Sequence, residues 1–207
     1  MKNIVILISG RGSNFEAILE RSRAERWADT VGAEIRAVIS NRPEAKGLVT
    51  ARNNGIEAKA LDHKTFASRE EFDKALGDLV ASYEPDLVVL VGFMRVLTPV
   101  FTDRFVGRML NIHPALLPLF PGLHTHERAI EAGCRVHGST VHFVSSVLDG
   151  GAIIPTDTPD TLADRGLVLE HKLYPAVVKA FLEGRVRLEE GRAVMDDATA
   201  RELAIFA

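Results

Sequence analysis

Short runs of residues that are apolar on both faces constrain the fold of this chain more than any other feature. Residues 3–8 are apolar and largely β-branched, and residues 87–91 read LVVLV. A strand with this pattern is buried between two layers of helices, because each of its faces must be covered. The two runs therefore predict an α/β protein in which helices cover both faces of an open sheet.

Further strands and helices alternate with these runs along the first half of the chain. Helical patterns follow the first strand, with Phe15, Ile18 and Leu19 on one face, and begin again after Ser68, where Glu71 completes a capping box. Other expected elements are strands at 35–39 and 56–61 and a helix at 45–54. Alternation at this spacing favours right-handed βαβ units and a parallel sheet.

The second half of the chain departs from this alternation. The expected elements are, in order, a strand at 109–113, a proline-rich loop at 114–122, an antiparallel strand at 139–144, a long helix at 159–182 and a hairpin at 186–195. No repeat or linker interrupts the sequence. We therefore predict one domain over 1–207, an α/β fold with an open, mostly parallel, twisted Rossmann-like sheet, helices on both faces and antiparallel C-terminal strands.

Composition excludes several classes of protein. The 207 residues carry a formal net charge of -3, which does not suggest a nucleic-acid surface or a basic membrane patch. The N-terminal apolar run is too short for a secretory signal, and no run approaches the roughly 20 residues of a membrane helix. One cysteine, Cys134, cannot form an intramolecular disulfide. We expect a cytoplasmic monomer or homodimer that binds small molecules and neither nucleic acid nor membrane.

The glycine-rich loop after the first strand predicts an anion site. Small residues let the backbone approach a ligand closely, and amide groups at the start of the next helix point at an anion. Gly12 is followed by Ser13 and Asn14, whose hydroxyl and amide suit a phosphate monoester. Phe15 replaces the third glycine of a dinucleotide fingerprint, and the lysine of a Walker loop is absent. A tight turn with a helix cap is the structural alternative.

Asn111 and His113 indicate chemistry at the end of a strand. Alternation places both side chains on the same face, and Pro114 ends the strand directly after them. Ligands of open α/β sheets bind at the carboxyl ends of the strands. An amide donor beside an imidazole can stabilise an oxyanion and move a proton. The alternative is a buried hydrogen-bonded pair without a catalytic role.

Asp149 lies in an Asp-Gly-Gly sequence, which by itself indicates a turn. The functional interpretation is a carboxylate that approaches His113, keeps it charged and relays protons. The seven histidines include His124, His126 and His137, but no cysteine or carboxylate stands at ligand spacing. We therefore expect no metal.

These motifs resemble those of the folate-dependent formyltransferases, in particular the glycinamide ribonucleotide transformylase family. In chain order the matching segments are ISGRGSN at 8–14, GFMR at 92–95, NIHP at 111–114, LLP at 116–118, PGLH at 121–124 and LDGG at 148–151. The segments around 111–118 and 149–151 are common to all folate-dependent relatives. The loop at 9–14 narrows the resemblance to the purine enzymes.

The resemblance implies an activity and a set of site residues. The formyl group of 10-formyltetrahydrofolate, a co-substrate, would pass without a metal to the amine of glycinamide ribonucleotide in purine biosynthesis. Asn111 and His113 would steady the oxyanion of a tetrahedral intermediate, and Asp149 would keep His113 charged and help carry a proton. The other implied contacts are Gly12, Ser13, Asn14 and Glu170 with the nucleotide, and Arg69, Met94, Arg95, Val96, Leu97 and Asn111 with the folate.

The sequence departs from this family at one place. After residues 149–154 the family has a further strand and a turn, whereas Pro155 follows here at once. Either a loop is missing between Ile154 and Pro155, or the chain has lost an edge strand. We favour the missing loop, which predicts a Cα separation well beyond the ~3.8 Å of a trans peptide.

Three other functions compete with this interpretation. A formyltetrahydrofolate deformylase is expected to carry an N-terminal regulatory domain, whereas Met1 here lies next to the first strand. The catalytic half of methionyl-tRNA formyltransferase would need an RNA-binding domain and a more basic surface. A non-catalytic nucleotide-binding module would use only the loop at 12–14, and would leave Asn111, His113 and Asp149 as unrelated coincidences.

Overall fold

The structure is a computed structural model that describes residues 1–134, 136–154, 159–189 and 192–204. It consists of two compact units, Met1–Leu123 with Ser139–Ile154, and His124–Gly138 with Pro155–Ala207. The proposed break between Ile154 and Pro155 lies outside the described residues.

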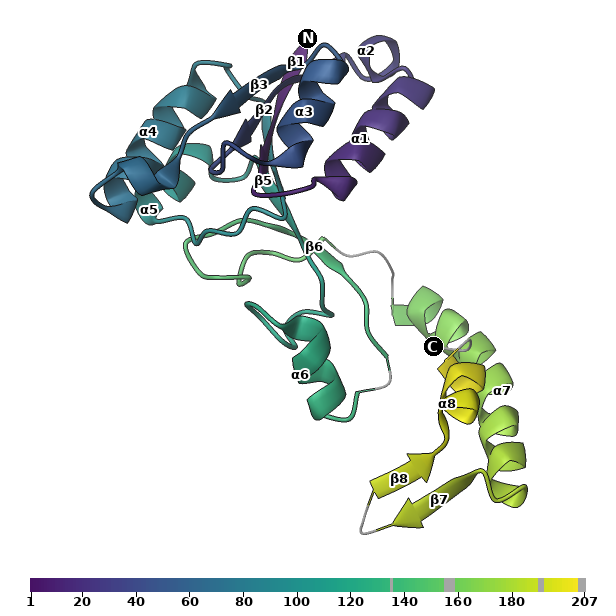
Figure 1. The fold of residues 1–207 in the computed structure, drawn as a ribbon. Coiled ribbons are helices and arrows are strands. Elements are labelled where there is room, and N and C mark those ends of the chain that lie inside the picture. The colour runs from purple at the N-terminus through teal and green to yellow at the C-terminus, as the bar shows by residue number, and fades with distance from the viewer. Residues whose placement is uncertain (135, 155–158, 190–191, 205–207) are drawn as a thin grey trace. The chain divides into compact units, whose positions relative to one another are not determined.

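The first unit is built on a six-stranded sheet with the order β3-β2-β1-β4-β5-β6 (Figure 1). The strands are β1 (Lys2–Ile8), β2 (Ala33–Ser40), β3 (Glu57–Ala60), β4 (Leu87–Val91), β5 (Met109–His113) and β6 (Thr140–Phe143). Neighbouring strands from β3 to β5 run parallel, and β6 runs antiparallel to β5. The predicted fold class is confirmed.

Helices cover both faces of this sheet, with α1 and α3 on one face and α4 and α5 on the other (Figure 1). Their bounds are α1 (Ser13–Ala24), α3 (Lys46–Asn53), α4 (Arg69–Ala81) and α5 (Pro99–Thr102). Three further helical segments are α2 (Trp27–Thr30), η1 (His63–Thr65) and η2 (Asp103–Phe105), and neither these nor α5 were predicted. The N-cap of α4 is formed by Ser68, whose Oγ accepts the Glu71 N–H at 3.1 Å.

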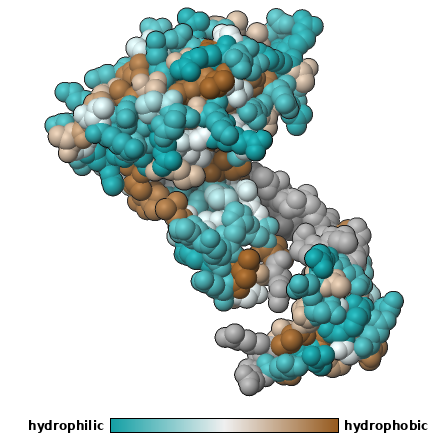
Figure 2. All heavy atoms as spheres, viewed as in Figure 1, coloured by the Kyte–Doolittle hydropathy of each residue, from teal (hydrophilic) through white to brown (hydrophobic). Residues whose placement is uncertain are grey.

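The apolar pattern of β1 builds two separate cores. Ile4, Ile6 and Ile8 pack toward α1 and α3, whereas Val5 and Leu7 pack toward α4 and α5. All five side chains are buried. The surface of this unit, by contrast, is mostly hydrophilic in the view of Figure 2. The run at 3–8 is therefore apolar throughout because both of its faces are covered.

The second unit contains α6 (Thr125–Glu131), α7 (Pro159–Leu182), the antiparallel hairpin of β7 (Val186–Glu189) and β8 (Arg192–Met195), and α8 (Asp197–Ala204). The long helix and the hairpin agree with the sequence prediction, whereas α6 and α8 were not predicted. The expected turn at 190–191 lies outside the described residues. Within the part of the chain that is described, no helix is long and apolar enough to cross a membrane.

Replacing Phe72 with Ala should lower the free energy of unfolding by about 3–5 kcal/mol. Phe72 is fully buried and meets the rings of His63 and Phe66 edge-on, so its removal leaves a cavity beneath α4. Urea unfolding followed by circular dichroism measures the change. Val106→Ala, at a position that is 73% exposed, is the control and should change the free energy by less than about 0.5 kcal/mol. Equal stability of the two variants would contradict this core.

Candidate active site

The strand order places three loops at one edge of the sheet. From β1 the chain forms β2 and β3 on one side and then continues on the other side as β4 and β5. Because β1, β4 and β5 are parallel, their carboxyl ends share that edge. Ligands of open α/β sheets bind where the strand order reverses in this way. The predicted substrate residues at 12–14 follow β1, those at 94–97 follow β4, and His113 ends β5.

The loop after β1 leads directly into the N-terminus of α1. Gly12 has a φ of 78°, in the left-handed region that favours glycine, and Ser13 and Asn14 are exposed at the start of the helix. Gly47 of α3 donates its N–H to the Gly10 carbonyl at 3.1 Å. A Cβ on Gly47 would lie 2.5 Å from the Ile8 side chain, so this close approach requires glycine. The loop thus presents helix-start amides and two polar side chains, as the anion-site interpretation requires.

The loop that carries the predicted folate residues is held at both ends by buried side chains. Ser9 Oγ accepts the Met94 N–H at 2.7 Å and donates to Asn41 Oδ1 at 2.5 Å. At the other end, Asp73 Oδ2 accepts the Thr98 N–H at 2.6 Å. Ser9 and Asp73 are both buried. Sequence reasoning missed these two supports, although a polar residue directly after a buried strand, or on the apolar face of a helix, is a signal for such a role.

The predicted folate residues differ in their exposure. Met94 and Val96 are exposed, and Leu97 is buried in the core. The guanidinium carbon of Arg95 lies 4.9 Å from the centre of the Phe72 ring, so Arg95 covers the top of that core. Arg69 is exposed at the first residue of α4. Two apolar side chains beside the ends of β1 and β4 therefore remain available to a flat ligand.

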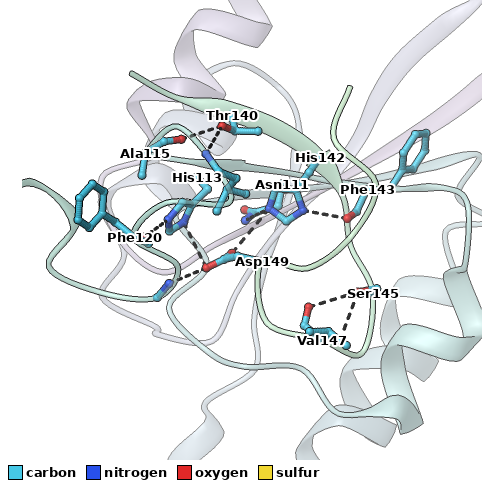
Figure 3. Close-up of polar contacts among 12 residues, drawn as sticks. Asn111, His113, Ala115, Phe120, Thr140, His142, Phe143, Ser145, Val147 and Asp149 are labelled. Atoms are coloured by element: carbon cyan, nitrogen blue, oxygen red, sulfur yellow. Dashed lines mark hydrogen bonds and ion pairs between the residues drawn. The ribbon is translucent and has the colours of Figure 1, made fainter. Parts of the chain in front are cut away.

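Asn111, His113 and Asp149 come together on one face of the sheet (Figure 3). His113 Nδ1 lies 3.4 Å from Asp149 Oδ2, and both side chains are almost fully buried, with 6% and 7% exposed. Asn111 lies two residues before His113 on β5, and its amide points toward the same place (Figure 3). The structure thus brings together the three residues that the sequence suggested for catalysis.

The His113 ring is held between a carbonyl and a carboxylate. Its Nε2 lies 2.9 Å from the Phe120 carbonyl, which can only accept a hydrogen bond, so Nε2 carries a proton. The same Asp149 oxygen that faces Nδ1 accepts the Gly122 N–H at 2.8 Å. A second proton on Nδ1 would make an imidazolium beside the carboxylate. The His113 ring thus lies between a hydrogen-bond acceptor at Nε2 and a carboxylate at Nδ1.

His142, which sequence reasoning did not single out, completes this cluster from β6. It is 2% exposed and pairs directly with Asn111 across the antiparallel strands. Its Nε2 lies 3.2 Å from Asn111 Nδ2 and 3.7 Å from Asp149 Oδ1. The alternating pattern predicted for 139–144 puts His142 on one face of that strand. The signal was present, but the pairing register with β5 was needed to connect it to Asn111.

Thr140 on β6 supports the loop that follows His113. Its Oγ accepts the Leu117 N–H at 3.0 Å and donates to the Ala115 carbonyl at 2.7 Å. Thr140 is the direct cross-strand partner of His113. One buried hydroxyl therefore fixes the start of the proline-rich loop whose Phe120 carbonyl contacts the His113 ring.

Two further expectations concern the second unit and a metal. Glu170 lies in α7, but its side chain is outside the described residues. The His126 and His137 rings are in contact, with centres 4.6 Å apart, and His124 bonds to Glu127. Among the described residues, no group of three or more His, Cys, Asp or Glu side chains is arranged to hold a metal ion.

Comparison with known proteins identifies the family. The family described as formyl transferase matches residues 2–178. The chain belongs to this formyl transferase family. It is 45% identical over 202 residues to phosphoribosylglycinamide formyltransferase of Escherichia coli (strain K12), with 94% of this chain and 93% of that protein covered. The corresponding protein of Haemophilus influenzae is 44% identical over 204 residues, covering 95% and 94%.

A solved formyl transferase supports the same assignment. Glycinamide ribonucleotide transformylase 1 from Symbiobacterium toebii superposes with a TM-score of 0.70 at 40% identity, covering 95% of each chain. The family resemblance seen in the sequence motifs is thereby confirmed. The similarity extends over nearly the whole formyl transferase chain.

In this formyl transferase, Gly151→Ala should lower kcat/KM at least tenfold. A Cβ at Gly151 would collide with the backbone carbonyl of Phe143, so the hydrogen bond from Phe143 N to the Ala152 carbonyl would break and the Asp149 loop would move. Val147→Ala in the same loop is the control, because the Val147 side chain is 65% exposed. A formyl-transfer assay compares the two, and equal activities would refute this role of Gly151.

Proposed function

We propose that this formyl transferase moves the formyl group of 10-formyltetrahydrofolate to the amine of glycinamide ribonucleotide, in de novo purine biosynthesis. The observation that carries the proposal is the cluster of Asn111, His113 and Asp149 at the sheet edge that also bears the glycine-rich loop. The names of relatives that match almost the full chain support the choice of acceptor.

The side chains suit direct attack of an amine on the formyl carbon. As the new C–N bond forms, negative charge develops on the formyl oxygen. The Asn111 amide and the Nε2–H of His113 are donors for this oxygen, which would take the place of the Phe120 carbonyl as acceptor for His113. Donors placed in advance where charge develops contribute about two to three powers of ten each.

Asp149 would assist the proton transfer that the reaction requires. The attacking amine becomes an ammonium in the tetrahedral intermediate, and N10 of the folate needs a proton as its C–N bond breaks. The Asp149 carboxylate stabilises an imidazolium at His113 and, through water, accepts the amine proton and passes it toward N10. One proton leaves one nitrogen and reaches the other, so the balance needs no metal and no covalent enzyme intermediate.

The remaining predicted residues would bind the two substrates. Gly12, Ser13 and Asn14 would hold the ribose phosphate, and Glu170 would contact the ribose. The folate would lie against Arg69, Met94, Arg95, Val96, Leu97 and Asn111. We further infer that residues 1–207 form a single formyltransferase domain in the cytoplasm, as a monomer or homodimer without nucleic-acid or membrane partners. The match of the family to residues 2–178 and the free thiol of Cys134 support these inferences.

His113→Ala should lower kcat for glycinamide ribonucleotide by two to four powers of ten, about the contribution of a general acid or oxyanion donor. Asp149→Asn should lower kcat in the same range. Circular dichroism should show that both variants fold as the wild type does. Asp78→Asn is the matched control, because Asp78 is an exposed carboxylate paired with Arg104. Full activity of His113→Ala would favour the non-catalytic binding module.

The acceptor is tested in the same assay by offering 10-formyltetrahydrofolate with water, glycinamide ribonucleotide or charged tRNA. Formyl transfer to glycinamide ribonucleotide is expected. Release of formate with water as sole acceptor would indicate a deformylase, and transfer to tRNA would indicate the methionyl-tRNA enzyme. Either result would overturn the proposed acceptor and leave the family unchanged.

Ser13→Ala should raise KM for glycinamide ribonucleotide about 10- to 100-fold, which corresponds to the loss of one hydrogen bond to a charged phosphate. KM for the folate should stay the same, because none of the predicted folate residues lies in the loop after β1. Ser22→Ala on the same helix is the control, since its hydroxyl donates to the Leu19 carbonyl within the helix. A rise in both KM values would show that the loop does not bind the nucleotide alone.

A further inference from the structure

We propose that His142 is a positioning residue, which holds the Asn111 amide in the orientation that turns its N–H groups toward the reacting formyl oxygen. The proposal rests on the proposed function and adds a residue to it. It follows from the contacts of His142, which lie on both sides of its ring (Figure 3).

The two hydrogen-bonding contacts of the His142 ring indicate which of its nitrogens carries a proton. Its Nδ1 lies 2.8 Å from the Phe143 carbonyl, which can only accept, so Nδ1 carries a proton. Its Nε2 lies 3.2 Å from Asn111 Nδ2, which can only donate. The two contacts together fit one form of the ring, the neutral tautomer with the proton on Nδ1 and the lone pair on Nε2.

The protonation of His142 bears on the orientation of the Asn111 amide. The lone pair on His142 Nε2 attracts the NH₂ end of the amide. Rotation of the amide by half a turn would place its oxygen against that lone pair, and two acceptors would face each other without a proton between them. Among the residues that the structure describes, no other group hydrogen-bonds to the Asn111 amide. His142 therefore decides which end of the amide faces it.

The orientation of the Asn111 amide matters for the proposed reaction. His142 Nε2 also lies 3.7 Å from Asp149 Oδ1, and the other oxygen of Asp149 lies 3.4 Å from His113. The end of the Asn111 amide that faces His142 thus also faces the place where Asp149 and His113 meet. With the NH₂ end there, its second N–H remains available to an oxyanion. With the oxygen end there, Asn111 would repel that charge.

The burial and pairing of His142 suit such a role. It is 2% exposed, and strand pairing places its backbone directly opposite that of Asn111. The ring cannot move away without breaking the hydrogen bond between Nδ1 and the Phe143 carbonyl. The preference for one amide orientation is therefore built into the β5–β6 pairing before substrates bind.

Two substitutions of His142 test the proposal in the full chain. His142→Leu removes the acceptor, and should lower kcat about 10- to 100-fold, with KM for both substrates within about 3-fold of wild type. His142→Gln retains an amide oxygen that can accept from Asn111, and should restore kcat to within about 5-fold of wild type. If the role of His142 were merely structural, the Gln and Leu variants would not differ in kcat alone.

A double-mutant cycle with Asn111→Ala shows whether His142 acts through Asn111. If it does, His142→Leu should lower kcat less than about 2-fold further once Asn111 is already Ala. Thermal unfolding and circular dichroism check the fold of each variant, and His142→Met, which also lacks a good acceptor, replaces the Leu variant if Leu does not fold.

The outcomes separate the two proposals. Wild type that transfers no formyl group to glycinamide ribonucleotide would refute the proposed function. With that activity present, the His142 proposal is refuted if the Leu (or Met) variant is as active as wild type, if Gln is as poor as Leu, or if the losses from His142 and Asn111 multiply in the cycle.

Discussion

The buried carboxylate of Asp149 is the constraint on which the site depends. Only 7% of its side chain is exposed, and a buried charge without partners costs several kcal/mol. The Gly122 N–H and the imidazole of His113 compensate one of its oxygens, and His142 lies beside the other. The two compensating partners come from β5 and the loop that follows it, whereas Asp149 itself follows β6. The carboxylate therefore draws together β5, β6 and the loop that contains Gly122.

The sheet holds the loops of the candidate site in fixed positions around this carboxylate. The polar loops after β1 and β4 leave the sheet where its strand order reverses, and Ser9 ties them together through its hydroxyl. Beneath them, two fully packed cores hold the strands from opposite faces. A rigid edge of this kind keeps donors in place before a substrate arrives, so that little reorganisation is needed as charge develops.

Much of this arrangement could be predicted from local patterns in the sequence. Apolar runs predicted β1 and β4, and alternation predicted that Asn111 and His113 share a face. The turn at Asp149 was predicted as well, and the structure shows that it is both a turn, with a φ of 51°, and a partner of His113. The role of His142 could not be predicted, because it depends on the register between β5 and β6, which no local pattern states. The short helices were missed because single turns lack a period long enough to detect.

A count of charges in the cluster explains why two histidines beside one carboxylate need not behave alike. A single buried carboxylate balances one imidazolium, and a second positive ring would remain uncompensated. His113 lies nearer to Asp149, at 3.4 Å against 3.7 Å, and its other nitrogen faces a carbonyl, so both of its nitrogens can carry protons. His142 Nε2 faces an amide NH₂, a donor that favours a lone pair on this nitrogen. In the proposed mechanism, His113 is thus the ring that exchanges a proton and His142 the ring that orients a donor, although both are imidazoles within reach of the same carboxylate.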